Sequence, residues 1–134
     1  MSAAKKLAKN KAWKEFSRYI RLRDSDCYGI AECRTCGDKK HWKQVHAGHF
    51  LAGRGESILF EETGCHAQCP ICNMVLDGNF KRYKAFIALE YGVGEVNRLE
   101  RLKGAILKRS ASDYNKLARE FREKADNLAS LLMQ

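Results

Sequence analysis

The sequence has little proline, no long apolar run and a shortage of acidic residues. Pro70 is the only proline among 134 residues, so proline-rich linkers are excluded, and the chain shows no internal repeat. No apolar run approaches the roughly 18 residues of a membrane span. The basic N-terminus is not followed by the hydrophobic segment of a signal peptide. We therefore expect a single cytoplasmic domain with no membrane association.

The shortage of acidic residues leaves a net charge of +9, which is spread unevenly. Basic residues are in excess over 1–23 and 79–134, whereas acidic residues are in excess over 24–78. Basic flanks suit a polyanion such as DNA, although an ordinary lysine-rich helical surface explains them equally well. An acidic centre inside a basic frame suits a metal-dependent nuclease, which must attract phosphate and also hold a cation.

Cysteine is present in an informative pattern. Four of the six cysteines form two Cys-x-x-Cys pairs, and each pair places two thiolates on one tight turn. In a reducing cytoplasm such pairs indicate a metal site rather than disulfides. The predicted ligands of one structural Zn²⁺ are Cys33, Cys36, Cys69 and Cys72. Cys27 and Cys65 are left over as small thiols, although Cys65 is close enough to Cys69 to be an alternative ligand.

Hydrophobic periodicity predicts a mostly helical chain. The expected helices cover about 5–23, 80–91, 95–108 and 113–133. The apolar stripe of the last helix is expected to pack on the domain's own core. A dimer seam is the alternative. Aromatic and branched residues favour a strand over 41–46, a returning strand from 49 and a short extended segment at 57–60.

The position of the single proline predicts where a further helix begins. Proline is favoured in the first turn of a helix, so Pro70 indicates a helix that starts at the second cysteine pair. Asn73 then lies in the first turn. Asp77 is expected one turn later on the same face.

Three histidines flank the cysteine pairs and are candidates for chemistry on phosphate: His46, His49 and His66. An imidazole can act as a general base near neutral pH. Phosphodiester hydrolysis also needs a metal to neutralise charge on the phosphate and on the departing oxygen. His41, beside a lysine-rich turn, is given no role.

The chain resembles the phage recombination endonucleases of the NinG (Rap) family, which belong to the HNH or His-Me finger nucleases. The resemblance covers about 19–92 and rests on an ordered set of motifs: Cys33-x-x-Cys36-Gly37, Ala47-Gly48-His49-Phe50, His66-x-Gln68-Cys69-x-x-Cys72-Asn73, Gly78-Asn79 and Tyr83. It implies an α+β, mostly helical fold with a zinc-stabilised ββα-metal finger. It also implies a structure-specific nuclease for branched DNA such as Holliday junctions and D-loops.

The resemblance implies a role for particular residues. His49 would be the general base and Asn73 a ligand of a catalytic Mg²⁺ or Mn²⁺. In many HNH proteins a metal ligand precedes the base, but here that position is Gly48, so the second ligand is expected to be His66, then His46 or Asp77. The middle asparagine of the HNH pattern is Gly64 here, so the hairpin loop must be held in another way.

Basic side chains are the candidate DNA contacts. Arg54 lies in a glycine loop just after His49 and is a candidate phosphate clamp, or an ordinary solvated arginine. The first helix is expected to follow the DNA backbone through Lys9, Lys14, Arg18 and Arg21. Because a junction needs two incisions, a homodimer is expected on symmetry grounds. Recombination proteins of host or phage are further candidate partners.

We predict one HNH-type nuclease domain over 1–134, with a basic helix (1–24), a zinc-stapled core (27–92) and C-terminal helices (93–134). Two other functions remain open at this point. The chain could be a non-catalytic zinc-dependent DNA-binding module, in which His49 is dispensable. It could also be a sequence-specific homing or restriction-type nuclease.

Overall fold

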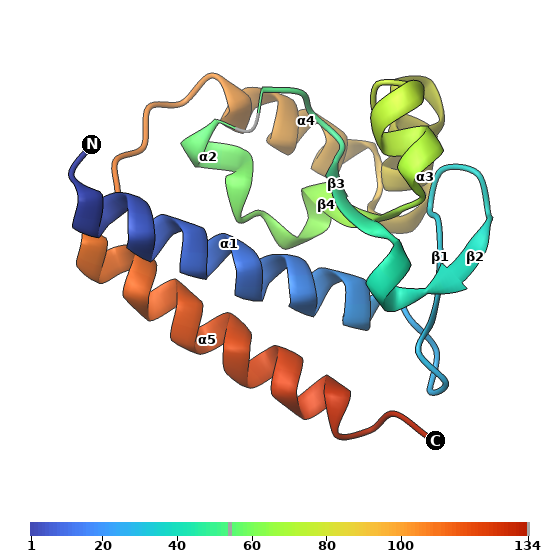
Figure 1. The fold of residues 1–134 in the computed structure, drawn as a ribbon. Helices are drawn as coiled ribbons and strands as arrows, with labels where there is room; N and C mark the ends of the chain where they lie inside the picture. The colour runs from blue at the N-terminus through green and yellow to red at the C-terminus, as the bar shows by residue number, and fades with distance from the viewer. Residues whose placement is uncertain (54, 134) are drawn as a thin grey trace.

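The computed structural model describes residues 1–53 and 55–133 (Figure 1). It is a mostly helical α+β structure with two small two-stranded sheets. The helices are α1 (Ala3–Arg23), α2 (Glu56–Leu59), α3 (Phe80–Tyr91), α4 (Val93–Lys103) and α5 (Ala111–Ala129). The strands are β1 (Ile30–Glu32), β2 (Lys39–His41), β3 (His46–His49) and β4 (Cys65–Gln68). None of the helices in the described part of the chain is long and apolar enough to cross a membrane.

Helices α1 and α5 lie side by side and run in the same direction (Figure 1). Side-chain caps start both: Ser2 accepts a hydrogen bond from the backbone of Lys5, and Ser110 forms a capping box with Asp113. Between the helices, Phe16 meets Phe121 edge to face with ring centroids 4.8 Å apart. The aromatic contact joins segments from opposite ends of the sequence into one core.

A second core lies between α3 and α4, where Tyr83, Ile87 and Leu99 are buried. The pair β3–β4 connects the two cores. Ala47 of β3 packs against the α1–α5 core, whereas Phe50, just after the strand, packs in the α3–α4 core. The strand that carries His49 is therefore fixed from both sides.

The two sheets are antiparallel pairs of neighbouring segments. Strand β1 pairs with β2, and β3 pairs with β4 so that Gly48 lies opposite His66 and His49 opposite Cys65. Strand β4 leads through Pro70 into a short, wide helical turn over Ile71–Val75. Asn73 thus lies in the helical turn that follows the strand pair, as the proline predicted.

Three expectations about short elements were wrong. The segment 41–46 is not one strand, because a 3-10 turn over Trp42–Gln44 separates β2 from β3. The returning strand is β4 and not the residues after 49. The segment 57–60 is helical over Glu56–Leu59, since a helical turn buries adjacent Ser57, Ile58 and Leu59 together, whereas a strand would alternate them.

The long helices agree with the sequence patterns, and their ends differ for local reasons. Helix α3 covers Phe80–Tyr91 as predicted, and Gly92, with φ of +95°, separates it from α4. Helix α4 begins at Val93 and ends at Lys103, short of the predicted end at 108, with Gly104 as its C-cap. Helix α5 begins before Asp113 because Ser110 provides the cap. Its residues Tyr114 and Phe121 are buried in the core.

Candidate functional site

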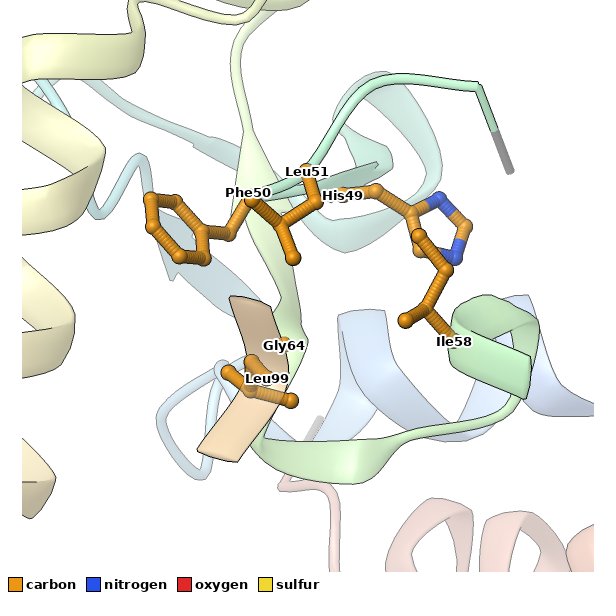
Figure 2. A pocket seen from close by; sticks show the side chains of 6 residues that line it. All are labelled: His49, Phe50, Leu51, Ile58, Gly64 and Leu99. Carbon is orange, nitrogen blue, oxygen red and sulfur yellow. The ribbon is translucent and has the colours of Figure 1, made fainter. Parts of the chain in front are cut away.

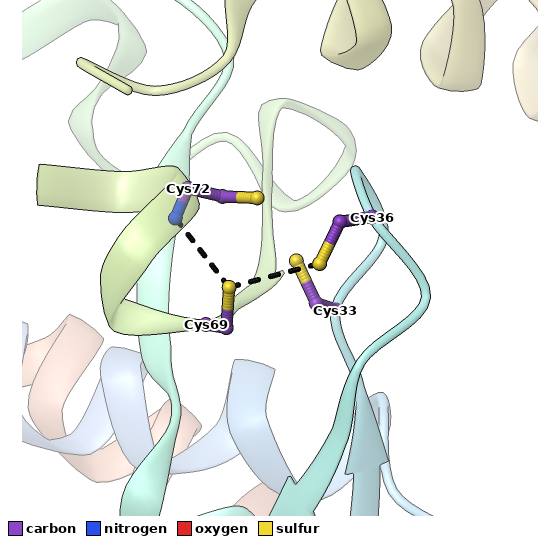
Figure 3. A group of neighbouring side chains, drawn as sticks. All are labelled: Cys33, Cys36, Cys69 and Cys72. Carbon is purple, nitrogen blue, oxygen red and sulfur yellow. Dashed lines mark hydrogen bonds between the residues drawn. The ribbon is translucent and has the colours of Figure 1, made fainter. Parts of the chain in front are cut away.

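The four predicted zinc ligands come together in one cluster. Their sulfur atoms all lie within 4.8 Å of one another, and Cys36 Sγ is 3.7 Å from Cys69 Sγ. Figure 3 shows two of them on the loop after β1 and two at the start of the helical turn after β4. Four cysteine sulfur atoms this close together match the donor set of a closed, structural zinc site.

Oxygen and nitrogen atoms form hydrogen bonds with three of the four sulfur atoms in this cluster. Thr35 Oγ1 lies 3.3 Å from Cys33 Sγ, the Cys72 amide donates to Cys69 Sγ at 3.4 Å, and Asn79 Nδ2 donates to Cys72 Sγ at 3.6 Å. Burial raises the pKa of the Cys33 thiol, but the hydrogen bonds from Thr35 and from backbone amides outweigh burial and lower its pKa to about 6. Burial raises the pKa of Cys36 to about 12. A bound dication would offset the negative charge that four thiolates bring together.

The two other cysteines lie elsewhere. Cys65 is completely buried in the α1–α5 core beside Phe16 and Ile20. Cys27 is exposed, and its carbonyl accepts a hydrogen bond from the Met133 amide at 2.6 Å. The structure therefore places Cys65 in a packing role and not in the sulfur cluster.

Among the described residues, Leu59 and Trp13 help to hold His49, which lies at the end of β3. Its Nε2 is 2.9 Å from the Leu59 carbonyl oxygen, and its ring stacks on Trp13 of α1 with centroids 5.3 Å apart. Because a carbonyl oxygen can only accept, Nε2 carries a proton in this contact, so in a neutral ring the lone pair would be on Nδ1. An oriented imidazole with a lone pair on a defined nitrogen is suited to accept a proton from water.

His49 and Asn73 line the same cavity, although they are far apart in the sequence. The cavity measures about 260 Å³. Its lining residues are Ala47, His49, Leu51, Ala52, Gly53, Asn73, Asp77 and Gly78. Asp77 follows the helical turn in a left-handed conformation, with φ of +51°. It therefore reaches the cavity from a tight turn and not from the helix face that was predicted.

His46 contacts Asn73 directly. The Asn73 Nδ2 lies 2.9 Å from His46 Nδ1, so the amide donates to the ring. His46 and Gly48 project from the same face of β3, because alternate residues of a strand share a face. The contact fixes the amide of Asn73 with Oδ1 directed toward Gly48, where a Cβ would lie 3.0 Å from that oxygen.

Sequence reasoning gave no role to Gln68, which lies over Gly48. A Cβ at position 48 would lie 1.9 Å from Gln68 Oε1, so only glycine leaves room for this side chain. Gln68 is completely buried. The signal available in the sequence was Gln68 itself, next to the third zinc cysteine, but its contact with Gly48 depends on the strand register.

His66 occupies a different environment from the other two histidines. Its Nε2 is 3.1 Å from the Thr63 carbonyl, and its Nδ1 is 2.7 Å from Arg23 Nη2 and 3.1 Å from Asp24 Oδ2. Burial lowers the pKa of His66 and outweighs the opposing effect of Asp24. Burial also opposes ionisation of Asp24, but hydrogen bonds from His66 and Arg23 prevail and lower its pKa. Both ring nitrogens of His66 are thus engaged in a buried network beside Tyr91.

The loop between β3 and β4 is held without the asparagine of the HNH pattern. The Gly64 carbonyl accepts a hydrogen bond from the Phe50 amide at 2.9 Å. Leu99 of α4 packs against Gly64, where a Cβ would lie 3.3 Å from the leucine methyl carbon. Figure 2 shows Gly64 and Leu99 together below His49 and Phe50. Packing from α4 therefore helps to hold this loop.

A comparison with known protein families assigns the chain to one of them. The family model described as "Bacteriophage Lambda NinG protein" matches residues 2–130, nearly the whole sequence. The chain belongs to the NinG family. It is 30% identical over 83 residues to "Protein ninG" of Salmonella phage P22, an alignment that covers 61% of this chain and 38% of that protein. No solved structure matched this NinG chain.

Three of the four basic residues predicted on the first helix of this NinG chain have intramolecular partners. Lys9 pairs with Glu56 at 3.0 Å, and Arg18 pairs with Asp126 at 2.6 Å. The Arg21 guanidinium carbon lies 5.2 Å from the centre of the Trp42 ring. The candidate phosphate clamp, Arg54, lies outside the described residues.

Lys14, the fourth basic residue, lines a groove between α1 and α5 in this NinG chain. The groove has a volume of about 410 Å³. Its lining residues are Lys11, Lys14, Glu15, Asn115, Ala118, Arg119 and Arg122. Four basic side chains and one acidic side chain line the groove. The two helices therefore form together a basic surface to which each contributes only a part.

Proposed function

We propose that this chain is a divalent-metal-dependent endonuclease that cuts branched DNA by phosphodiester hydrolysis. The carrying observation is that His49 and Asn73 line one cavity, close to a four-cysteine cluster that can hold zinc. In this proposal β3, β4 and the turn Ile71–Val75 form a ββα-metal finger. The zinc cluster fixes the start of that turn relative to the strand pair.

The residues fit the two requirements of the reaction. His49 accepts a proton from a water molecule, and the water oxygen forms a bond to phosphorus in line with the 3′ oxygen, whose bond to phosphorus breaks. The products carry 5′-phosphate and 3′-hydroxyl ends. Asn73, held by His46, would hold a Mg²⁺ or Mn²⁺, which when bound stabilises charge on the phosphate and on the leaving oxygen.

Among the candidate second ligands, the contacts support His46 and Asp77 over His66. His46 lies against Asn73, and Asp77 lines the cavity that Asn73 and His49 share. His66 belongs to the network of Asp24 and Arg23, around a separate cavity.

The basic groove between α1 and α5 is the proposed binding surface for a DNA arm. Phosphate contacts of this kind position DNA without reading its sequence, which suits a structure-specific enzyme. A homodimer would place two such sites on a two-fold symmetric junction. Light scattering of the protein with and without a four-way junction tests this stoichiometry.

A nicking assay tests the function. Zinc-loaded protein is incubated with a four-way junction and with linear duplex in Mg²⁺ or Mn²⁺, for the native chain, His49→Ala and His41→Ala. We expect divalent-dependent cleavage of the junction, loss of at least about a hundredfold in His49→Ala and native activity in His41→Ala. Circular dichroism and zinc content verify that both variants fold.

Three results would count against the proposal. Full cleavage by His49→Ala excludes that histidine as the base. Cleavage without divalent ions excludes the metal-dependent mechanism. DNA binding with no cleavage under any condition supports the non-catalytic module, whereas cutting of one duplex sequence supports the homing or restriction type.

A further inference from the structure

The amide of Gln68 is fixed in one orientation by its two hydrogen atoms. Its Nε2 donates to the Gly78 carbonyl at 2.9 Å and to Thr35 Oγ1 at 3.2 Å. Because the Gly78 carbonyl can only accept, a rotation of the Gln68 amide by about 180° would place its oxygen against the Gly78 carbonyl oxygen. The side-chain oxygen of Gln68 must therefore point away from Gly78, toward Gly48.

That oxygen is buried and lacks a donor. Within the part of the chain that the structure describes, Gln68 Oε1 has no hydrogen-bond partner. A buried acceptor without a partner costs about 1–3 kcal/mol, and native proteins contain few of them. Because the Gln68 side chain is completely buried, its unpaired oxygen indicates that an electropositive group from outside the described chain binds next to it.

A second oxygen is directed to the same place. Asn73 Oδ1 lies 3.0 Å from the point where a Cβ of residue 48 would be, and Gln68 Oε1 lies 1.9 Å from that point. The Asn73 amide is oriented by its own donor bond to His46. Two amide oxygens from β4 and from the following helical turn therefore converge above Gly48.

The geometry points to Gln68 as an oxygen ligand, beside Asn73, for a divalent cation, and this inference rests on the proposed nuclease function. Mg²⁺ and Mn²⁺ prefer oxygen ligands, and Mg²⁺ commonly takes only one or two from the protein and the rest from water and substrate phosphate. The Asp77 carboxylate in the adjoining cavity adds the negative charge that the two neutral amides lack. Gly48 then leaves the space that Gln68 Oε1 occupies.

The test measures Mn²⁺ binding directly, without DNA and independently of activity. Zinc-loaded protein is titrated with Mn²⁺ and the signal of free Mn²⁺ is followed by electron paramagnetic resonance. Gln68→Met keeps the length of the side chain and removes the oxygen, and we expect its Mn²⁺ affinity to fall at least about tenfold. Tyr83→Phe is the matched control, because it removes another buried hydrogen bond, to the Gly48 carbonyl, and leaves both oxygens in place.

The outcomes separate a ligand from a structural residue. Native Mn²⁺ affinity in a Gln68→Met protein that retains its zinc overturns the inference and assigns the oxygen to a bound water. If Gln68→Met loses zinc, Gln68→Glu decides: a carboxylate at the same position must bind Mn²⁺ more tightly than the native amide, and unchanged or weaker binding overturns the inference.

The same measurements distinguish this inference from the proposed function. Mn²⁺ binding that depends on Gln68 and Asn73, in a protein that does not cut DNA, would refute the nuclease and retain the cation site. Metal-dependent nicking that is lost in His49→Ala, together with native Mn²⁺ affinity in Gln68→Met, would retain the nuclease and refute the role of Gln68.

Discussion

Replacing Gly48 with alanine should destabilise the protein although it adds only one methyl group. The new Cβ would lie 1.9 Å from Gln68 Oε1 and 2.8 Å from Gln68 Cδ, so the buried amide must move. Overpacking of this kind costs about 1–3 kcal/mol, and each hydrogen bond that Gln68 loses to Gly78 or Thr35 adds about 1 kcal/mol. We expect Gly48→Ala to lower the free energy of unfolding by about 3 kcal/mol.

Urea denaturation of zinc-saturated protein, followed by circular dichroism, measures this change. Gly94→Ala in α4 is the control: a Cβ there meets no atom within 4 Å, so alanine should stabilise the protein by about 0.5–1 kcal/mol. The decisive variant combines Gly48→Ala with Gln68→Ala, which removes the clash. The two changes should then couple by about 1–3 kcal/mol. Strict additivity of the two effects would refute the contact between these residues.

Three further predictions concern zinc, pH and DNA. Cys69→Ala should lose zinc and the cooperative unfolding transition, because metal binding and folding are linked. Cys27 lies on the surface, so Cys27→Ala should keep both. Metal analysis and thermal melting check this prediction. Asp24 has a lowered pKa in the folded state, so its contribution to stability is complete above its ordinary pKa of 3.8 and is lost as pH falls through the folded pKa. The free energies of unfolding of the native and Asp24→Asn proteins should differ by about 3 kcal/mol near neutral pH and become equal in acid. A difference that stays constant with pH would contradict this. Lys14→Gln and Arg119→Gln should each lower the slope of log affinity against log salt by about 0.9 on duplex arms, measured by fluorescence anisotropy; an unchanged slope would place the DNA elsewhere.

The parts of the molecule that local chemistry determines could be predicted from the sequence. Two Cys-x-x-Cys pairs indicated the sulfur cluster, and the cluster forms. Helix α3 matched its apolar periodicity and its glycine stop. Each cysteine pair and the glycine stop depend on residues within a turn or two of one another, so the sequence pattern contains most of the information about them.

The arrangement around Gly48 could not be predicted, because it depends on register. Gln68 reaches Gly48 only because β3 and β4 pair so that Gly48 lies opposite His66. A change of register by one residue would turn Gln68 to the other face. The ranking of His66 as the first metal ligand did not include the carboxylate of Asp24, which is remote in sequence and contacts its ring.

Basic residues show the same limit. Charge on α1 predicted a phosphate-binding helix, but Arg18 is engaged by Asp126 of α5. The groove that Lys14 shares with Arg119 exists only after the two helices have packed. Composition therefore indicated an excess of positive charge without locating the surface on which basic residues gather.

The parallel packing of α1 and α5 has a consequence for the order of folding during synthesis. The apolar face of α1, with Phe16, finds its partner Phe121 only after most of the chain has been made. The cysteine cluster closes as soon as Cys72 is available. Local contacts form faster than distant ones, so the metal-binding segment should fold on the ribosome before α5 emerges, and the contact between α1 and α5 should form last.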